Sequence, residues 1–251
     1  MEQDPGVTIR EVSDPADPEV EAVAGLLLET FADPNIVLPA ARMREFLEAT
    51  RAGSRAAGRT FHVLAARAGG RLAGATVFSY VAAAGVGFSE YMVVAPGFRG
   101  QGVARRLFDA RRAVLDRQAR TAGRQGAAGL FIEVENPERT PAEFLERERA
   151  TAMDAWARLR FFHHLGFRRC DLTYVQPPLA PGREPVDYLD LLFLPWDESI
   201  RRAGVLPPQV LLDAVKPIWV GWAPDTYEDE LRRLGSRIGG RPVRLVPLFP
   251  Q

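Results

Sequence analysis

Apolar and polar residues alternate along several stretches of this chain, a pattern typical of half-buried β-strands. The pattern predicts strands over residues 7–12, 60–67, 72–82, 88–95, 129–136, 167–175 and 186–194. Elsewhere apolar residues recur at helical spacing, which predicts amphipathic helices over 18–31, 40–55, 102–120 and 153–166. Towards the C-terminus, Asp225 followed by Glu228 resembles a capping box that would begin another helix, and residues 242–248 predict one more strand.

Two of the predicted strands carry carboxylates among their apolar residues. Alternation along 88–95 assigns one face to Phe88, Glu90, Met92 and Val94 and the other to Ser89, Tyr91 and Val93. Along 129–136, Leu130, Ile132 and Val134 alternate with Phe131, Glu133 and Glu135. Glu90 and Glu133 are therefore the carboxylates to consider if these two strands border a site.

The stretch from Met92 to Leu107 passes from an apolar strand through a glycine-rich turn into a helix. The first N–H groups of a helix have no acceptor within the helix, and the helix dipole favours negative charge there. Gly100 and Gly102 lack a Cβ, so the backbone can approach a phosphate closely. Arg99 and Arg105 can add charge-assisted hydrogen bonds. The stretch thus predicts an anion site.

The residue types exclude two common phosphate-binding loops. A Walker loop requires Gly-Lys-Ser/Thr, and Lys216 is the only lysine of the chain. A dinucleotide fingerprint requires a glycine spacing that Gly97, Gly100 and Gly102 do not have. The run from Val94 to Ala104 instead fits V-x-P-x-x-R-G-x-G-x-A, which resembles the acyl-CoA-binding motif of the GNAT family of N-acetyltransferases.

A second similarity to this family lies at 160–167. The string from Arg160 to Phe167 resembles the second GNAT signature, Phe-Tyr-x-x-x-Gly-Phe, with Phe162 at the position of the tyrosine. Gly166 is expected to end the preceding helix in a left-handed conformation. Relatives reach this helix within a few residues of the preceding strand, whereas here an inserted segment over about 137–152 separates the two.

The resemblance covers roughly residues 5–195 and implies an α+β GNAT fold, with a mixed, mostly antiparallel central sheet flanked by helices and a C-terminal α/β extension. It implies a GNAT domain over 1–196, including the insertion, and an extension over 197–251. The extension is open to three interpretations: a surface for self-association into a homodimer, a docking surface for a protein acceptor, or a cap on the core.

Acetyl-CoA as co-substrate, with no metal, is what the resemblance implies. In the family the loop amides hold the pyrophosphate, and a bulge in the motif strand frees amides for the pantetheine arm. Carried onto this sequence, the binding residues are Met92, Val93, Val94, Arg99, Gly100, Gln101, Gly102, Val103, Ala104, Arg105, Asn136 and Phe162.

The catalytic residues follow from what acyl transfer to an amine requires. A protonated alkylamine must lose a proton before it attacks a thioester. Glu90 is the first candidate for the base because family bases often lie on the motif strand, and Glu133 is the second. Phe162 has no proton to give to the leaving thiolate, so His163 and Tyr174 are the candidate acids; departure of the thiolate unassisted is the alternative.

Composition narrows the function classes. Lysine and arginine balance aspartate and glutamate, so the chain lacks the basic charge typical of nucleic-acid binders. Cys170 stands alone, and no apolar run reaches the ~18 residues of a membrane span. Three histidines without metal-ligand spacing argue against zinc. No start typical of a signal peptide is present, so a cytoplasmic protein with no nucleic-acid or membrane partner is expected.

The expected function is therefore an acyl-CoA-dependent N-acyltransferase, which transfers acetyl from acetyl-CoA to a small-molecule amine by direct attack on the thioester. A non-catalytic acyl-CoA sensor and a protein or peptide N-acetyltransferase are the alternatives. Acidic residues of the insertion (Glu138, Glu143, Glu146 and Glu148) could attract a cationic acceptor. The arginines between them favour a mixed-charge surface helix instead.

Overall fold

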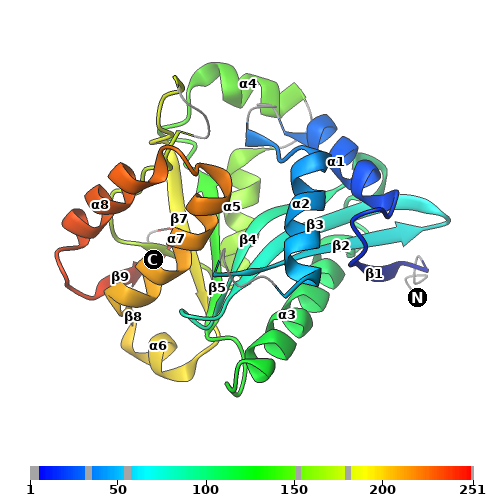
Figure 1. Ribbon diagram of the computed structural model, residues 1–251. Coiled ribbons are helices and arrows are strands. Elements are labelled where there is room, and N and C mark those ends of the chain that lie inside the picture. The colour runs from blue at the N-terminus through cyan, green and yellow to red at the C-terminus, as the bar shows by residue number, and fades with distance from the viewer. Residues whose placement is uncertain (1–5, 32–35, 54–57, 151–153, 179–181, 250–251) are drawn as a thin grey trace.

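A single mixed sheet organises the molecule in the computed structural model, which describes residues 6–31, 36–53, 58–150, 154–178 and 182–249 (Figure 1). The described residues form nine strands in the order β1-β2-β3-β4-β5-β7-β6-β9-β8. Their bounds are β1 Thr8–Val12, β2 Thr60–Ala68, β3 Arg71–Val81, β4 Val86–Val94, β5 Gly129–Glu135, β6 Arg168–Cys170, β7 Leu189–Pro195, β8 Val205–Leu206 and β9 Val243–Val246. Neighbouring strands are antiparallel except β4 and β5, which run parallel.

Helices cover both faces of this sheet. One face carries α1 (Glu19–Thr30), α2 (Ala40–Arg51), α7 (Pro208–Trp222) and α8 (Tyr227–Ile238), and the other carries α3 (Val103–Thr121) and α5 (Ala155–His164). In Figure 1, α4 (Ala142–Ala150) lies at the upper end of the view and α6 (Glu198–Ala203) at the lower end. A short 3-10 turn, η2 (Pro96–Phe98), joins β4 to α3.

The apolar stripes predicted by periodicity form the interfaces between helices and sheet. On α3, Val103, Leu107 and Leu115 are buried against the sheet, together with Leu130 and Ile132 of β5. Burial of such side chains stabilises the fold by about 1.5–3 kcal/mol each. Because both faces of the central strands are covered, β4 and β5 lie deep in the molecule.

The sequence predicts the end of α5 correctly and misplaces the start of α8. Gly166 follows α5 with φ +91°, the left-handed conformation expected there. At α8 the expectation is wrong: the capping position is Thr226 rather than Asp225, and the Thr226 hydroxyl donates to the Pro178 carbonyl.

The mixed, mostly antiparallel fold class is confirmed, while two strands differ from their predicted bounds. The strand expected over 167–175 ends at Cys170. The Asp171 N–H still donates to the Arg244 carbonyl of β9 at 2.9 Å, and the chain then turns, with the Leu172 N–H donating to the Cys170 carbonyl at 2.9 Å. The last strand of the expected core begins at Leu189 instead of 186, and Val186 makes only an isolated bridge to Gln176.

Residues 197–249 extend the sheet beyond β6, at the edge opposite β1. β9 pairs with β6, β8 pairs with β9, and α7 packs on β3 and β4. These residues therefore reach the centre of the molecule as well as its edge. In the part of the chain that is described, no helix combines the length and apolar character needed to cross a bilayer.

Candidate active site

β4 and β5 pair over a short stretch and then diverge. Their parallel pairing joins Gly87 to Leu130, Phe88 to Phe131 and Ser89 to Ile132, and no pair beyond Ser89 connects these two strands. The expected splay of the motif strand is thus present, and its closed end lies at Ser89 and Ile132.

A β-bulge at Glu90 changes which face each residue of β4 occupies. Val77 of β3 pairs with Tyr91 and Phe78 pairs with Ser89, so Glu90 is the extra residue. Glu90 and Tyr91 consequently both lie on the α7 side, whereas Met92 packs against the α3 side. The predicted alternation, which placed Met92 with Glu90 and Ser89 with Tyr91, is wrong because it assumed a regular strand.

The amides of Met92 and Val94 point into the gap between the diverging strands. The Ala95 N–H donates to the Ala73 carbonyl of β3 at 2.9 Å, and successive N–H groups of a strand point to opposite edges. The N–H groups of Met92 and Val94 therefore point away from β3, where β5 no longer pairs. Two donors are available there to an extended ligand.

At the open end of the gap, the glycine turn leads into the N-terminus of α3. Gly100 and Gly102 have φ +76° and +74°, a conformation that other residues adopt only with strain, and no heavy atom lies within 4 Å of a Cβ built on either. The first bond within the helix joins the Arg106 N–H to the Gly102 carbonyl at 3.1 Å. The preceding amides of Val103, Ala104 and Arg105 thus have no acceptor within the helix, which is the arrangement predicted for an anion site.

A cavity, here the strand-gap cavity, runs along this gap. Its lining comes from the α3 N-terminus, both diverging strands and α5: Ser89, Met92, Val94, Ala104, Arg111, Ile132, Val134, Arg158, Phe161 and Phe162, with five more residues named below. Phe162, expected to contact the pantetheine arm, therefore borders this cavity.

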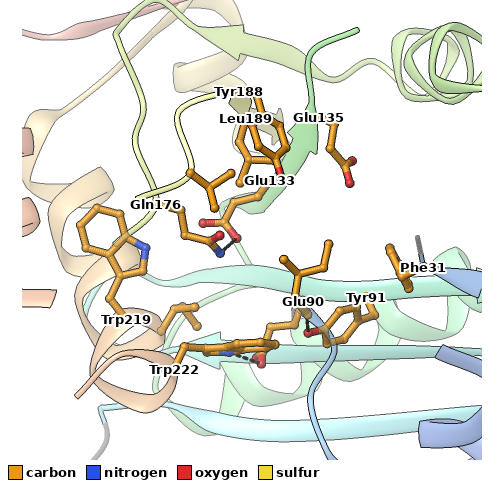
Figure 2. Close-up of a pocket in the computed structure, with 13 residues that line it drawn as sticks. Phe31, Glu90, Tyr91, Glu133, Glu135, Gln176, Tyr188, Leu189, Trp219 and Trp222 are labelled. Atoms are coloured by element: carbon orange, nitrogen blue, oxygen red, sulfur yellow. Dashed lines mark hydrogen bonds between the residues drawn. The ribbon is translucent and has the colours of Figure 1, made fainter. Parts of the chain in front are cut away.

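A second cavity, here the aromatic cavity, opens on the other side of the sheet (Figure 2). Its own lining comprises Ile36, Gln176, Val186, Tyr188, Leu189, Ile218, Trp219 and Trp222. The two cavities share Phe31, Glu90, Tyr91, Glu133 and Glu135. Glu90 and Glu133 thus stand where the two cavities meet.

Glu133 has the environment of a base that works near neutral pH. Burial raises the pKa of its carboxyl from 4.5 to about 7, although a hydrogen bond from Tyr174 opposes the shift. The Tyr174 hydroxyl donates to one carboxylate oxygen and Gln176 Nε2 donates to the other at 3.2 Å. Each oxygen keeps a free lone pair, and Figure 2 shows the carboxylate directed into the cavity.

Glu90 is held in a different way. One of its oxygens accepts from Ser79 Oγ at 2.6 Å and from Arg59 Nη1 at 2.8 Å, and the other accepts from Trp222 Nε1 at 2.9 Å. The ion pair is almost sealed, with side-chain exposures of 2% for Arg59 and 1% for Glu90. Glu90 lies at the site as predicted, but three donors already occupy it.

The candidate acids lie outside the gap. Tyr174 is buried below Glu133, where it donates to that carboxylate and accepts from Trp219 Nε1 at 3.2 Å. Burial raises the pKa of its hydroxyl well above 10, so it stays protonated. His163 is exposed on α5 and contacts the Phe249 ring, and it borders neither cavity.

Asn136, the remaining predicted contact of the coenzyme, is engaged within the chain. Its amide donates to the Asp190 carboxylate at 3.0 Å, and its side-chain oxygen accepts from the Glu138 N–H at 3.0 Å. It borders neither cavity. Its predicted role stays a prediction that no contact in the site supports.

The insertion reaches the site through an ion-pair bridge. Arg158 of α5 contacts Glu135 of β5 at 2.9 Å and Glu148 of α4 at 2.9 Å. Glu148 is buried, while Glu143 and Glu146 are exposed beside exposed arginines, as a mixed-charge surface helix predicts. Among the described residues, no group of three or more potential metal ligands occurs.

Sequence interpretation missed several lining residues, among them Trp219, Trp222 and Arg111. Trp219 and Trp222 lie far from both signatures, so no local signal connected them to Glu133 and Glu90. Arg111 did have a signal, because it follows Leu107 by four residues on the apolar stripe of α3, and it is buried to 1% exposure. An arginine at an apolar position of a helix is therefore a candidate binding residue.

The comparisons with known proteins agree with this geometry. Residues 59–169 match the family model described as "Acetyltransferase (GNAT) domain". The matched residues include both sequence signatures, and the match supports the GNAT superfamily that those signatures predicted. No curated protein sequence matched the chain.

Solved structures with the same fold have low sequence identity to this chain. A GNAT-family protein from Bacteroides thetaiotaomicron superposes with TM-score 0.54 at 16% identity, over 85% of this chain and 96% of its own. The ribosomal-protein-S18-alanine N-acetyltransferase of Escherichia coli gives 0.47 at 16% identity, over 76% and 94%. A Salmonella typhimurium protein solved with its cofactor acetyl-CoA gives 0.44 at 19% identity, over 77% and 95%.

Proposed function

We propose that this chain is an N-acyltransferase that transfers the acyl group of an acyl-CoA to the amine of a small molecule. The observation that carries the proposal is that Glu133 lines two cavities: one extends to Ala104 in the first turn of α3, and the other opens on the opposite side of the sheet. A thioester and an amine can thus reach the same carboxylate from two sides.

The amides of the α3 N-terminus and the strand gap together suit coenzyme A. The free amides of Val103 and Ala104 would bind the pyrophosphate, with Arg99 and Arg105 nearby. The amides of Met92 and Val94 would bind the pantetheine arm and hold the thioester between β4 and Glu133. An oxyanion on the thioester carbonyl would find a backbone donor on β4.

Glu133 is the base in this proposal, and Glu90 is not. The protonated amine gives a proton to Glu133, either directly or through one water molecule, and the free amine attacks the thioester carbon. The C–N bond forms, the C–S bond breaks, and the thiolate leaves with the electron pair. The nitrogen releases its remaining extra proton to solvent, which gives the neutral amide. None of the predicted acids borders the gap, so the thiolate leaves unassisted and takes its proton from solvent, as a thiol pKa near ~8.5 permits.

The aromatic cavity favours a cationic acceptor with a flat apolar body. Glu133 and Glu135 supply negative charge, while Tyr91, Trp219 and Trp222 supply ring faces and edges. This combination supports a small-molecule amine as the acceptor. A protein N-terminus is the alternative acceptor, as is a sensor that binds acyl-CoA without turnover.

The proposal can be tested with purified protein. The protein is mixed with acetyl-CoA and with each member of a panel of aromatic and aliphatic amines, and the release of free CoA is measured. We expect release with some amines, and loss of this activity in Glu133→Gln with CoA affinity unchanged. Glu138→Gln, which changes an exposed carboxylate of the insertion, is the matched control and should stay active. Binding of CoA with no turnover of any amine would support the sensor, and unaltered CoA affinity in Arg99→Glu/Gly102→Glu would refute the binding site.

A further inference from the structure

The closed end of the strand gap holds a buried arginine. Arg111 of α3 is only 1% exposed and lines the strand-gap cavity. Its Nη1 donates to Ser89 Oγ at 2.5 Å and lies 3.4 Å from Thr76 Oγ1. Ser89 is the last residue of β4 that pairs with β5, so the guanidinium marks the apex where the two strands separate.

Two of the three guanidinium nitrogens lack a hydrogen-bond partner among the described residues. Nε and Nη2 are buried and donate to no hydrogen-bond acceptor among the described residues, and no carboxylate of those residues forms an ion pair with Arg111. The guanidinium also makes a cation–π contact with the Phe108 ring, whose centroid lies 5.2 Å from the guanidinium carbon. Burial lowers the pKa of Arg111 to about 9, which still leaves it charged at neutral pH.

A buried, unpaired charge is costly, and natural proteins rarely retain one without a counter-charge. Ser89 and Thr76 supply only neutral oxygens. A methionine or leucine would fill the same position on the apolar stripe of α3 without this cost. The arginine is therefore best explained by an anionic group that enters the cavity.

The direction of the cavity indicates which part of a ligand reaches Arg111. An acyl-CoA that binds at the α3 N-terminus extends past Val94 and Met92 towards Ser89, so its acyl end leads. Ala104 and Arg111 are seven residues apart, or ~10 Å along the helix, which keeps the pyrophosphate away from this arginine. The end of the acyl chain is then the part that meets the guanidinium.

We propose that the acyl donor carries a terminal carboxylate, as malonyl-CoA and succinyl-CoA do, and that Arg111 binds this carboxylate with Ser89. This inference rests on the proposed function and specifies its donor. A planar guanidinium can donate two parallel hydrogen bonds to a carboxylate, and Nε with Nη2 is one of the edges that does so. The Ser89 hydroxyl, which accepts from Arg111, has its own proton left to donate.

The experiment compares the affinities of paired acyl-CoAs for the full chain by calorimetry. Succinyl-CoA is paired with butyryl-CoA and malonyl-CoA with propionyl-CoA, so each pair has the same number of acyl carbons and differs in charge. We expect the charged member of at least one pair to bind roughly 10- to 100-fold more tightly, the range of a hydrogen-bonded charge. In Arg111→Met the preference should vanish while the affinity for free CoA stays the same.

Arg112→Met is the matched control, because Arg112 is the next residue of α3 and its side chain is half exposed. It should keep the wild-type preference. The comparison in the wild type is decisive by itself, so the test does not depend on whether Arg111→Met folds.

Equal or weaker binding of both charged members by the wild type would overturn the inference and leave the proposed function intact, provided that uncharged acyl-CoAs bind. Persistence of the preference in folded Arg111→Met would also overturn it. If neither CoA nor any acyl-CoA binds, the proposed function fails as well, and the two failures are thereby distinguished.

Discussion

Glu90 and Glu133 lie on the two strands that diverge at the site, yet their surroundings differ. Glu90 accepts from Arg59, Ser79 and Trp222 and is sealed from solvent. Glu133 accepts from Tyr174 and Gln176, two neutral donors, and keeps a face towards the cavity. Its position on the motif strand favoured Glu90 as the base. The smaller number of hydrogen-bond donors around Glu133, and the absence of a cation among them, favour Glu133 instead.

The difference shows what a base requires beyond proximity. A carboxylate that already accepts three hydrogen bonds, one of them from a guanidinium, has few lone pairs left for a proton of the substrate. A buried carboxylate without a cation gains proton affinity, and a pKa of about 7 suits proton transfer at neutral pH. Under the proposed function, Glu90 is therefore structural and Glu133 is the base, and mutation can test that assignment.

The largest expected effect is on the rate in Glu133→Gln. Removal of a general base lowers turnover roughly 100- to 10,000-fold. Free CoA release under saturating acyl-CoA measures it, with calorimetry to show that CoA still binds. If Glu133→Gln stays active and folded Glu90→Gln does not, the assignment of the two carboxylates is reversed.

The next effect is on stability, at Arg59. Arg59→Met leaves Glu90 buried without its cation, and breaking a buried pair costs about 3–5 kcal/mol of unfolding free energy. Denaturant titration measures this loss. The double variant Arg59→Met/Glu90→Leu should recover most of it, because it buries no unpaired charge. A double variant no more stable than the single would contradict the view that the pair is structural.

A smaller effect is the pH dependence of stability contributed by Glu133. Its pKa is higher in the folded chain than the usual 4.5, so this group stabilises the fold fully below about pH 4.5 and loses that contribution as the pH rises through about 7. As the pH rises above 7, the unfolding free energy of the wild type should therefore fall by up to ~3 kcal/mol more than that of Glu133→Gln. Thermal or denaturant unfolding at pH 5 and pH 8 checks this, and parallel curves for the two proteins would refute it.

The smallest effect concerns Tyr174→Phe. The Tyr174 hydroxyl stabilises ionised Glu133, so its removal should raise the pKa of that carboxyl further. Because the ionised form is the base, the rising limb of the pH–rate profile should move to higher pH, by roughly half a unit to one unit. A general acid at Tyr174 would instead lower the rate without this shift.

Local chemistry determined most of what the sequence could predict. The glycine turn and most of the alternating strands depend on neighbouring residues, and they appear near their predicted bounds. The bulge at Glu90 was anticipated only through the family resemblance, since alternation alone predicts a regular strand. The short strand β6 pairs with β9, which is distant in sequence, so a local pattern could not define its length.

The roles within the site required the tertiary structure. Arg59 neutralises Glu90 across 31 positions of sequence, and Trp222 approaches the same carboxylate from 132 positions away. No window of sequence contains these pairs. Arg111 is the exception, since its place on an apolar stripe is visible in the sequence once every polar residue on such a stripe is questioned.

The indole of Trp222 donates to Glu90 and packs beside Tyr91, so the last quarter of the chain contributes to the lining of the aromatic cavity. Together with Trp219, this indole forms one wall of the space where an acceptor would rest. A polypeptide shortened to its first 196 residues would lack that wall but not the glycine turn. Under the proposed function, substitutions in α7 would therefore change the choice of acceptor and leave the affinity for the coenzyme unchanged.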